Sequence, residues 1–216
     1  MAVMQVNPTR MELTRLKRRL VTAKRGHKLL KDKRDEMVRQ FILLIRRNQQ
    51  LRKEVEQELS GALREFAFAR AVMEPAALEA AVLYPAREAR LEIGQRNVMS
   101  VKVPVIKIQE GSLSEAVMSY GMAETSAQLD DAIASVANVL PKLVELAEIE
   151  STCNLLADEI EKTRRRVNAL EYVMIPEHEE TIRYISMKLD ENESSTKVRL
   201  MKVKEMVLED AHHYKQ

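Results

Sequence analysis

Residues 13–58 of this chain have the sequence LTRLKRRLVTAKRGHKLLKDKRDEMVRQFILLIRRNQQLRKEVEQE. Steps of three and four residues from Leu13 meet an apolar side chain at ten of fourteen positions. A repeat of seven keeps the apolar stripe on one side of a helix and favours a left-handed coiled coil. The stretch therefore predicts a long helix whose stripe needs a partner helix. The fourteen positions are Leu13, Leu16, Leu20, Ala23, His27, Leu30, Arg34, Met37, Phe41, Leu44, Asn48, Leu51, Val55 and Glu58.

Signals for the start of this helix lie just before the stripe. Asn7 followed by Pro8 fits an N-cap with proline in the first turn, and Thr9 three residues before Glu12 fits a capping box. From Leu63 the seven-residue period is no longer visible in the sequence, although helical texture continues to Glu74.

A second stripe lies near the other end of the chain. Pro176 lacks an amide hydrogen and clashes with the preceding turn, so we expect a kink there. The simplest partner for each stripe is the other one, which predicts antiparallel pairing of roughly residues 10–58 with residues 145–207. The second stripe consists of Leu146, Ile149, Cys153, Leu156, Ile160, Thr163, Val167, Leu170 and Met174, then Ile182, Ile185, Leu189, Leu200, Val203 and Val207.

Between the two stripes the period changes from helical to two. Apolar and polar residues alternate at 90–93 and again at 99–105, around a turn expected at Gly94–Asn97. This pattern predicts a β-hairpin. Pro104 indicates an edge strand or a strand end. A lone hairpin is marginally stable in water, so it should lean on the helices or on another protein.

Short helices are expected on both sides of the hairpin. An alanine-rich segment covers residues 76–83. Ser112 is a candidate cap for a later helix, which Pro141 would separate from the long C-terminal helix. Its predicted buried stripe consists of Leu129, Ile133, Val136 and Leu140.

Together these patterns predict a mainly α fold. It contains a long antiparallel coiled coil of N- and C-terminal helices, a middle helical segment and a short β-hairpin. We expect an N-terminal coiled-coil helix at 1–60 and a C-terminal coiled-coil helix at 142–216. The middle region, 61–141, would hold short helices and a hairpin near 89–106.

Composition and scattered polar residues give no sign of a catalytic centre. The five glycines form no phosphate-binding loop, and the four histidines form no ligand set. We therefore predict no catalytic residues, no cofactor and no metal. The single cysteine, Cys153, falls on the second stripe and is interpreted as a small buried side chain. Without a signal pattern or a long apolar run, the protein is expected to be soluble and cytoplasmic.

The net charge of +2 conceals a strongly basic segment. Residues 10–34 contain eleven Lys or Arg and two acidic residues, and Arg164, Arg165 and Arg166 form a second basic group. Such a run is typical of binding to nucleic acid, an anionic membrane or an acidic protein, or of a solvated coiled-coil surface. Aromatic residues that would stack on bases do not accompany it.

Long segments of the sequence resemble a known family. Residues 7–13 (NPTRMEL) and 23–35 (AKRGHKLLKDKRD) are similar to the N-terminus of the D subunit of the V-type (A/V-type) rotary ATPase. Residues 162–171 (KTRRRVNALE) with 173–176 (VMIP) resemble its C-terminal part, and 97–104 (NVMSVKVP) resemble its middle segment. The resemblance covers essentially the whole chain.

The resemblance implies a central rotor shaft that transmits torque and couples ATP hydrolysis or synthesis to ion transport. In the family, catalytic A and nucleotide-binding B subunits surround the paired terminal helices, and the middle part meets the F subunit and a membrane-ring adaptor. The chain would be non-catalytic, and peripheral on the cytoplasmic side of the membrane. The alternative is a free-standing basic coiled-coil adaptor that binds nucleic acid or anionic membrane.

Two groups of residues are the predicted partner-binding surfaces. Basic residues would push against acidic and carbonyl groups of the hexamer, and apolar hairpin residues would help to dock a protein resembling the F subunit. The basic group is Arg10, Arg15, Lys17, Arg18, Lys24, Arg25, Arg164, Arg165 and Arg166, and the hairpin group is Leu91, Ile93, Val101 and Val103.

Overall fold

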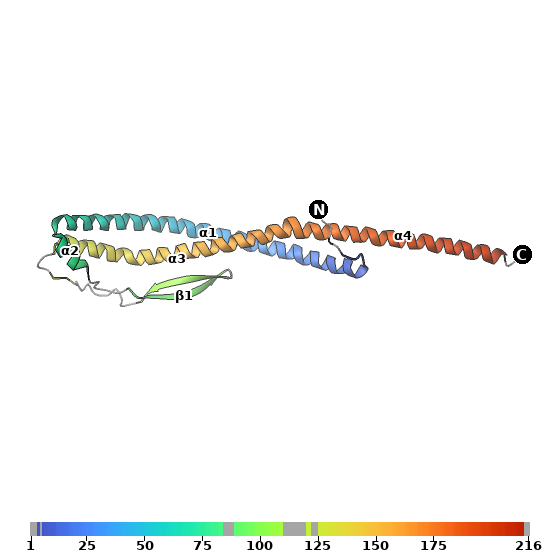
Figure 1. Ribbon diagram of the computed structural model, residues 1–216, viewed down its shortest axis with the longest axis horizontal. Coiled ribbons are helices and arrows are strands. Elements are labelled where there is room, and N and C mark those ends of the chain that lie inside the picture. Colours follow the sequence, from blue (N-terminus) through green and yellow to red (C-terminus); the bar gives the residue numbers. More distant parts are fainter. Residues whose placement is uncertain (1–3, 5, 84–88, 110–119, 122–124, 214–216) are drawn as a thin grey trace. The chain divides into compact units, whose positions relative to one another are not determined.

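The computed structural model describes residues 4, 6–83, 89–109, 120–121 and 125–213 (Figure 1). The predicted fold class is confirmed: the chain is mainly helical, its N-terminal helix packs against the C-terminal helices, and one β-hairpin is present. The elements are α1 (Arg10–Val72), α2 (Pro75–Val82), β1 (Leu91–Val98), β2 (Val101–Ile108), α3 (Ala127–Ala169), a π-helical turn (Leu170–Met174) and α4 (Ile175–His213).

The chain forms two compact units. Unit 1 contains Met1–Arg34 and Lys162–Gln216, and unit 2 contains Asp35–Glu161. Helix α1 continues past residue 60 to Val72, and α3 begins at Ala127, well before residue 142. The proposed division into regions 1–60, 61–141 and 142–216 stays a prediction.

In unit 1, the first part of α1 lies antiparallel to α4. Arg10 meets Glu193 at 3.5 Å, and Lys24 meets Glu179 at 2.6 Å, so partner numbers fall along α4 as they rise along α1. Helix α1 begins at Arg10, with Thr9 Oγ1 accepting a hydrogen bond from the Glu12 amide at 3.2 Å. Thr9 is therefore the capping residue, and the interpretation of Asn7 as N-cap is wrong.

The core of unit 1 mixes apolar and polar side chains. Leu16, Val167 and Ile185 are buried as the stripes predict. Thr181 is also fully buried: its hydroxyl donates to the Glu177 carbonyl at 2.7 Å and accepts from the Met4 amide at 3.2 Å. These bonds satisfy a polar group that would otherwise lower stability. Among the residues of unit 1 that the structure describes, the buried ones are Leu16, Thr163, Val167, His178, Thr181 and Ile185.

The expected disturbance near Pro176 takes the form of a π-helical turn. Residues Leu170–Met174 form the wide turn, and the Ile175 amide donates to the Leu170 carbonyl, five residues back. Proline in a regular helix collides with the carbonyl four residues earlier, and a π turn is one of the known ways to relieve such a conflict. The stripe shifts as a result, so Met174 is exposed while His178 becomes buried.

The second stripe does not reach as far as predicted. Residues 194–208 of α4 are exposed at every position, including the predicted stripe residues Leu200, Val203 and Val207. Helix α1 begins at Arg10, whose side chain already meets Glu193, so no described part of α1 extends alongside these residues.

In unit 2, the rest of α1 pairs with α3 and the pairing extends further than predicted. Glu58 forms an ion pair with Lys142, and Ser135 Oγ donates to Glu65 at 2.7 Å. The apolar stripe of α1 continues through Ala62 and Ala69, and Met73 just after the helix is buried as well, so the expected loss of period after Leu63 is wrong. Alanines carry little hydrophobic signal in a sequence, yet they allow two helices to approach closely. One buried cluster near the end of α1 contains Ala69, Met73, Leu78, Ala81 and Leu129.

Helix α3 buries a different face from the predicted one. Leu129 is buried as expected, but Ala132 and Val139 complete the stripe, while Ile133 and Val136 are 41% and 45% exposed. The buried face of α3 therefore includes the small Ala132, while the more hydrophobic Ile133 beside it is exposed.

Pro141 does not interrupt α3, contrary to the prediction. A helix-interior proline costs about 3 kcal/mol or more. The buried cluster of Leu51, Val55 and Val139 and the Lys142–Glu58 ion pair hold the helix together on both sides of it. The predicted cap at Ser112 lies outside the described residues.

The hairpin pairs β1 with β2 in the register Val98↔Val101 to Leu91↔Ile108. Its turn consists of Met99 and Ser100, with φ values of 50° and 74°, so the predicted turn at Gly94–Asn97 is wrong. Two consecutive positive φ angles are typical of the two-residue turns whose twist matches paired strands. Asn-Gly usually supplies them, and Met-Ser gives no such signal.

Pro104 lies within β2, opposite Gln95, and the strand continues to Ile108. The Ile106 amide, two residues on and therefore at the same edge, donates to Glu148 Oε2 at 2.9 Å. The missing amide hydrogen of Pro104 therefore falls on the open edge of β2 and removes no bond from the ladder. The prediction of an edge strand is confirmed.

The hairpin leans on the helices of unit 2, as expected. Val103 is fully buried and Val101 is 9% exposed, and both pack against the fully buried Leu156 of α3. Phe41 and Leu44 of α1 complete this group with Val98. The contact explains how a two-stranded sheet holds its place along α3 (Figure 1).

Candidate partner-binding surfaces

All nine predicted basic residues lie in unit 1 and are exposed. Six are on α1, and Arg164, Arg165 and Arg166 form the end of α3. Arg15 lies 3.6 Å from Glu12, and Arg10 and Lys24 reach across to α4. The structure thus gathers both basic groups in one unit, on helices that are far apart in the sequence.

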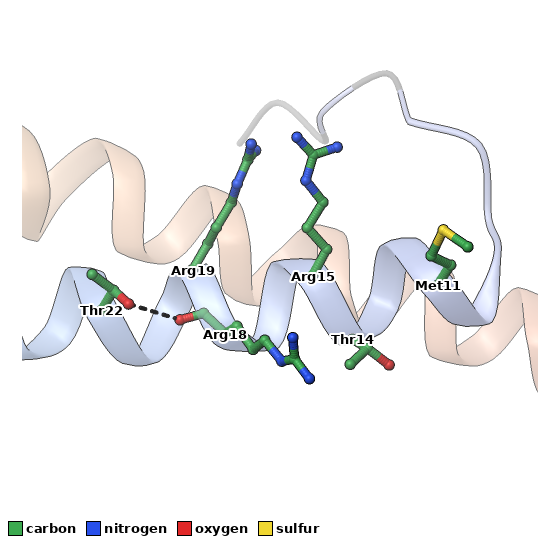
Figure 2. Close-up of a pocket in the computed structure, with 6 residues that line it drawn as sticks. All are labelled: Met11, Thr14, Arg15, Arg18, Arg19 and Thr22. Carbon is green, nitrogen blue, oxygen red and sulfur yellow. Dashed lines mark hydrogen bonds between the residues drawn. The ribbon is translucent and has the colours of Figure 1, made fainter.

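The basic face of α1 includes one arginine that the sequence interpretation missed. Figure 2 shows a surface hollow lined by Met11, Thr14, Arg15, Arg18, Arg19 and Thr22. Arg19 follows Arg15 by four residues, the spacing that places two side chains on the same helical face. The spacing alone was enough to identify Arg19. Thr22 donates its hydroxyl proton to the Arg18 carbonyl at 3.1 Å, which ties its side chain to the helix.

The structure separates the four predicted hairpin residues into two pairs. Val101 and Val103 face the helices of unit 2 and are buried there. Leu91 and Ile93 are 48% and 73% exposed. They lie opposite Ile108 and Ile106, and positions directly opposite on paired strands share a face. We call Leu91, Ile93, Ile106 and Ile108 the outer aliphatic face of the hairpin.

His27 and Cys153, the other side chains that could take part in chemistry, both have structural roles in the fold. His27 Nε2 lies 3.3 Å from Glu171 Oε2, so this histidine joins α1 to the π turn. Cys153 is buried, as interpreted from the sequence, and burial together with the nearby Glu150 carboxylate raises the pKa of its thiol. A thiol with a raised pKa is a poor nucleophile.

Among the described residues, no three or more His, Cys, Asp and Glu side chains gather as a metal site. The described helices include none long and apolar enough to cross a membrane.

These features define a class of protein before any comparison: a helical coiled-coil protein with exposed basic and aliphatic surfaces. Comparison with known proteins is consistent with that class. Residues 12–205 match the family of the ATP synthase D subunit. The chain is 57% identical to the V-type ATP synthase D subunit of Acetivibrio thermocellus, with 100% of this chain and 98% of the relative covered.

Two other similar proteins are also V-type ATP synthase D subunits. The V-type ATP synthase D subunit of Clostridium botulinum strain Langeland is 57% identical over 95% of this chain and 96% of its own length. That of Thermoanaerobacter sp. strain X514 is 55% identical over 96% of this chain and 99% of its own length. The chain belongs to the ATP synthase D subunit family, and it is thus a non-catalytic stalk subunit of a V-type rotary ATPase.

Proposed function

We propose that this chain is the central rotor shaft of its complex. It transmits torque between a hexamer of catalytic A and nucleotide-binding B subunits and the membrane rotor, and so couples ATP hydrolysis or synthesis to ion transport. The observation that carries the proposal is the long antiparallel pairing of α1 with α3 and α4 within each unit. Two helices that pack against each other along their length resist bending and twisting better than a single helix.

The exposed basic residues of unit 1 supply a suitable surface for the moving contact. A rotor meets successive partners and must leave each of them again. Exposed ion pairs are individually weak, about 0–1 kcal/mol, so they form and exchange without trapping the rotor in one position. The predicted basic residues push against the hexamer in this way, and Arg19 is added to them. They are Arg10, Arg15, Lys17, Arg18, Lys24, Arg25, Arg164, Arg165 and Arg166.

The outer aliphatic face of the hairpin is the proposed docking surface for a protein resembling the F subunit. Leu91 and Ile93 would contact that protein directly. The buried Val101 and Val103 hold the hairpin against α1 and α3, so their role is to position the docking face. A membrane-ring adaptor is the further partner, and the complex would place this chain on the cytoplasmic side of the membrane as a peripheral subunit. Membership of the family leaves the alternative of a nucleic-acid or membrane adaptor without support beyond the basic residues.

Assembly with the hexamer tests the proposal most directly. The chain alone should neither bind nor hydrolyse ATP, whereas mixing it with a purified hexamer of A and B subunits should give a complex with one copy of the chain. A single asymmetric shaft cannot match a three-fold hexamer, so the three catalytic sites should show unequal nucleotide affinities once it is bound. Native mass spectrometry and nucleotide titration measure both. Complexes with three copies of the chain, or failure to assemble, would contradict the proposal.

The hairpin surface gives a separate prediction. Replacing Leu91 and Ile93 together by Asp should weaken binding of the F-type subunit roughly tenfold or more, because two carboxylates without partners would be buried in an apolar contact, which is costly. The matched control is Ile42→Asp with Leu43→Asp, two exposed residues of α1 in the same unit. Isothermal titration calorimetry measures the affinity, and circular dichroism checks that helical content is unchanged. Equal affinities for the two variants would place the docking surface elsewhere.

A further inference from the structure

The π-helical turn of unit 1 carries three consecutive exposed apolar side chains. Tyr172 is 67% exposed, Val173 59% and Met174 42%. The core of unit 1 buries Val167 before the turn and His178 after it, and none of the five residues of the turn is buried. Pro176 accounts for the wide turn itself. It does not account for three large apolar residues on the outside, where polar residues would serve a solvated helix equally well.

The geometry of the turn restricts what covers these side chains. Successive residues of a helix point in directions about 100° apart. Tyr172, Val173 and Met174 therefore spread over a broad arc of the helix surface instead of forming a stripe. A partner helix lying in a groove contacts residues three and four apart, so it would reach at most part of this arc. A concave surface that wraps the turn covers all three.

Exposed basic residues lie on one side of the turn, whereas the carboxylates of Glu177, Glu179 and Glu180 follow it on α4. Arg164 and Arg166 are exposed one to two helical turns before it on α3. On α1, His27 contacts Glu171 at 3.3 Å, which brings the neighbouring exposed Arg25 and Lys28 to the same level of unit 1. Within the turn, the carboxylate of Glu171 lies 3.3 Å from His27, and beyond it that of Glu179 lies 2.6 Å from Lys24. Charge complementarity therefore calls for acidic residues on whatever encloses the apolar residues, on the side that faces Arg164 and Arg166.

We propose that Tyr172, Val173 and Met174 are an apolar contact centre that inserts into a concave, apolar-lined surface of the surrounding hexamer, with acidic residues where its edge faces Arg164 and Arg166. The proposal rests on the rotor function proposed above and adds a second kind of contact to it. The basic residues supply exchangeable, salt-sensitive attraction, while the π turn supplies contact area that salt does not screen. Tyrosine is among the residues that most often dominate an interface.

A matched pair of double variants tests the proposal. Tyr172→Ala with Met174→Ala removes two members of the contact centre, and alanine preserves helix propensity. The control is Tyr184→Ala with Met187→Ala, which removes the same two residue types from exposed positions of α4 at 43% and 64% exposure. A third variant, Arg164→Gln with Arg166→Gln, removes only charge. Surface plasmon resonance of the full chain on immobilised hexamer of A and B subunits, at low and high salt, gives the dissociation constants.

We expect the contact-centre variant to bind roughly tenfold or more weakly at both salt concentrations, and the control to stay within about twofold of the wild type. The arginine variant should differ from the wild type at low salt only. Equal affinities of the contact-centre and control variants, with normal wild-type binding, would overturn this inference and leave the rotor function intact. A wild-type chain that does not bind the hexamer would overturn both.

Two other occupants are distinguished with the same variants. Sedimentation velocity of the isolated chain detects a second copy on the π turn as a dimer that the contact-centre variant loses. Co-sedimentation with vesicles of phosphatidylglycerol and phosphatidylcholine detects a membrane surface in the same way. If the contact-centre variant loses the dimer or the vesicle binding and the control variant keeps it, the assignment to the hexamer is overturned.

Discussion

Replacing Leu156 by Ala should lower the free energy of unfolding by about 2–5 kcal/mol, the range for large-to-small substitutions in a packed core. Leu156 is fully buried at the place where the hairpin meets the two helices of unit 2. Its side chain packs with Val101 and Val103, so the substitution leaves a cavity beneath both. Neither helix can close the cavity without losing its pairing with the other, and β2 is held by the Ile106–Glu148 hydrogen bond.

The neighbouring residue provides the control for this prediction. Leu155→Ala makes the same chemical change one position earlier, where the side chain is 37% exposed. Surface substitutions change stability by about 0.5 kcal/mol or less, so a partly exposed leucine should lose much less than Leu156. Urea unfolding followed by circular dichroism gives both values. Similar losses for the two variants would show that the hairpin does not seal a core at Leu156.

The same substitution should release the hairpin selectively. Limited trypsin digestion of the folded protein reports on the Arg96 and Lys102 peptide bonds, which lie in paired strands next to the turn. In the Leu156→Ala variant these bonds should become accessible, because a two-stranded sheet without its support is marginally stable. Unchanged protection in that variant would mean that the strand ladder alone holds the hairpin together.

The long helices and their antiparallel partners could be predicted because the relevant residues are large. Leu16, Met37 and Leu51 are strongly apolar, they recur at coiled-coil spacing, and all three are buried. Where the interior selects small or polar side chains, the pattern becomes invisible. Ala62 and Ala69 continue the stripe without a hydrophobic signal, and Thr181 is buried because its hydroxyl has two hydrogen-bond partners. Such positions depend on the partner helix, which a local pattern does not describe.

The hairpin illustrates the same limit. Alternation located the strands, yet Gly94 and Asn97 drew the turn to the wrong place because these residues are typical of turns. The observed register pairs Gly94 with Val105 inside the ladder and leaves Met99 and Ser100 to turn. Packing of Val101 and Val103 on Leu156 favours this register, since a slip by one residue would turn both valines to solvent.

For the partner-binding surfaces, the sequence located charge but not exposure. The basic residues of α1 and of the end of α3 are exposed, as a charge run usually is. Among the hairpin residues, only Leu91 and Ile93 are open to a partner, because β-strand alternation defines two faces without saying which one the helices cover. The exposed π turn escaped notice because the repeat places Met174 on the buried stripe, four residues after Leu170, whereas Met174 is exposed in the structure.

Neutralising both basic groups together should reduce ATP-driven rotation of the assembled complex about tenfold or more. The variant replaces Arg15, Lys17, Arg18, Lys24 and Arg25 with Gln, together with Arg164, Arg165 and Arg166. Exposed charge contacts contribute about 0.2–1 kcal/mol each, so single substitutions should have small effects. Eight of them together exceed the 1.4 kcal/mol that corresponds to a factor of ten.

Folding should be much less affected than rotation, because all eight side chains are exposed. Of the eight, Lys24 pairs with Glu179 of α4 and Arg15 with Glu12 of α1, and an exposed pair contributes at most about 1 kcal/mol. The matched control for the second group is Arg46→Gln, Lys53→Gln and Arg64→Gln, three exposed basic residues of α1 in unit 2. This control should rotate normally, whereas the Arg164, Arg165 and Arg166 triple variant should lose part of its rotation.

Salt gives an independent measure of the same mechanism. At about 0.15 M ionic strength charges are screened beyond about 8 Å, and at 1 M beyond about 3 Å. Rotation of a bead fixed to the hairpin should therefore slow with added salt in the wild type, and salt should change the neutralised variant far less. The π turn continues to hold the rotor in both, since contacts of apolar residues are not screened. Normal torque in the neutralised variant would show that the basic residues do not push, and that apolar contacts alone carry the load.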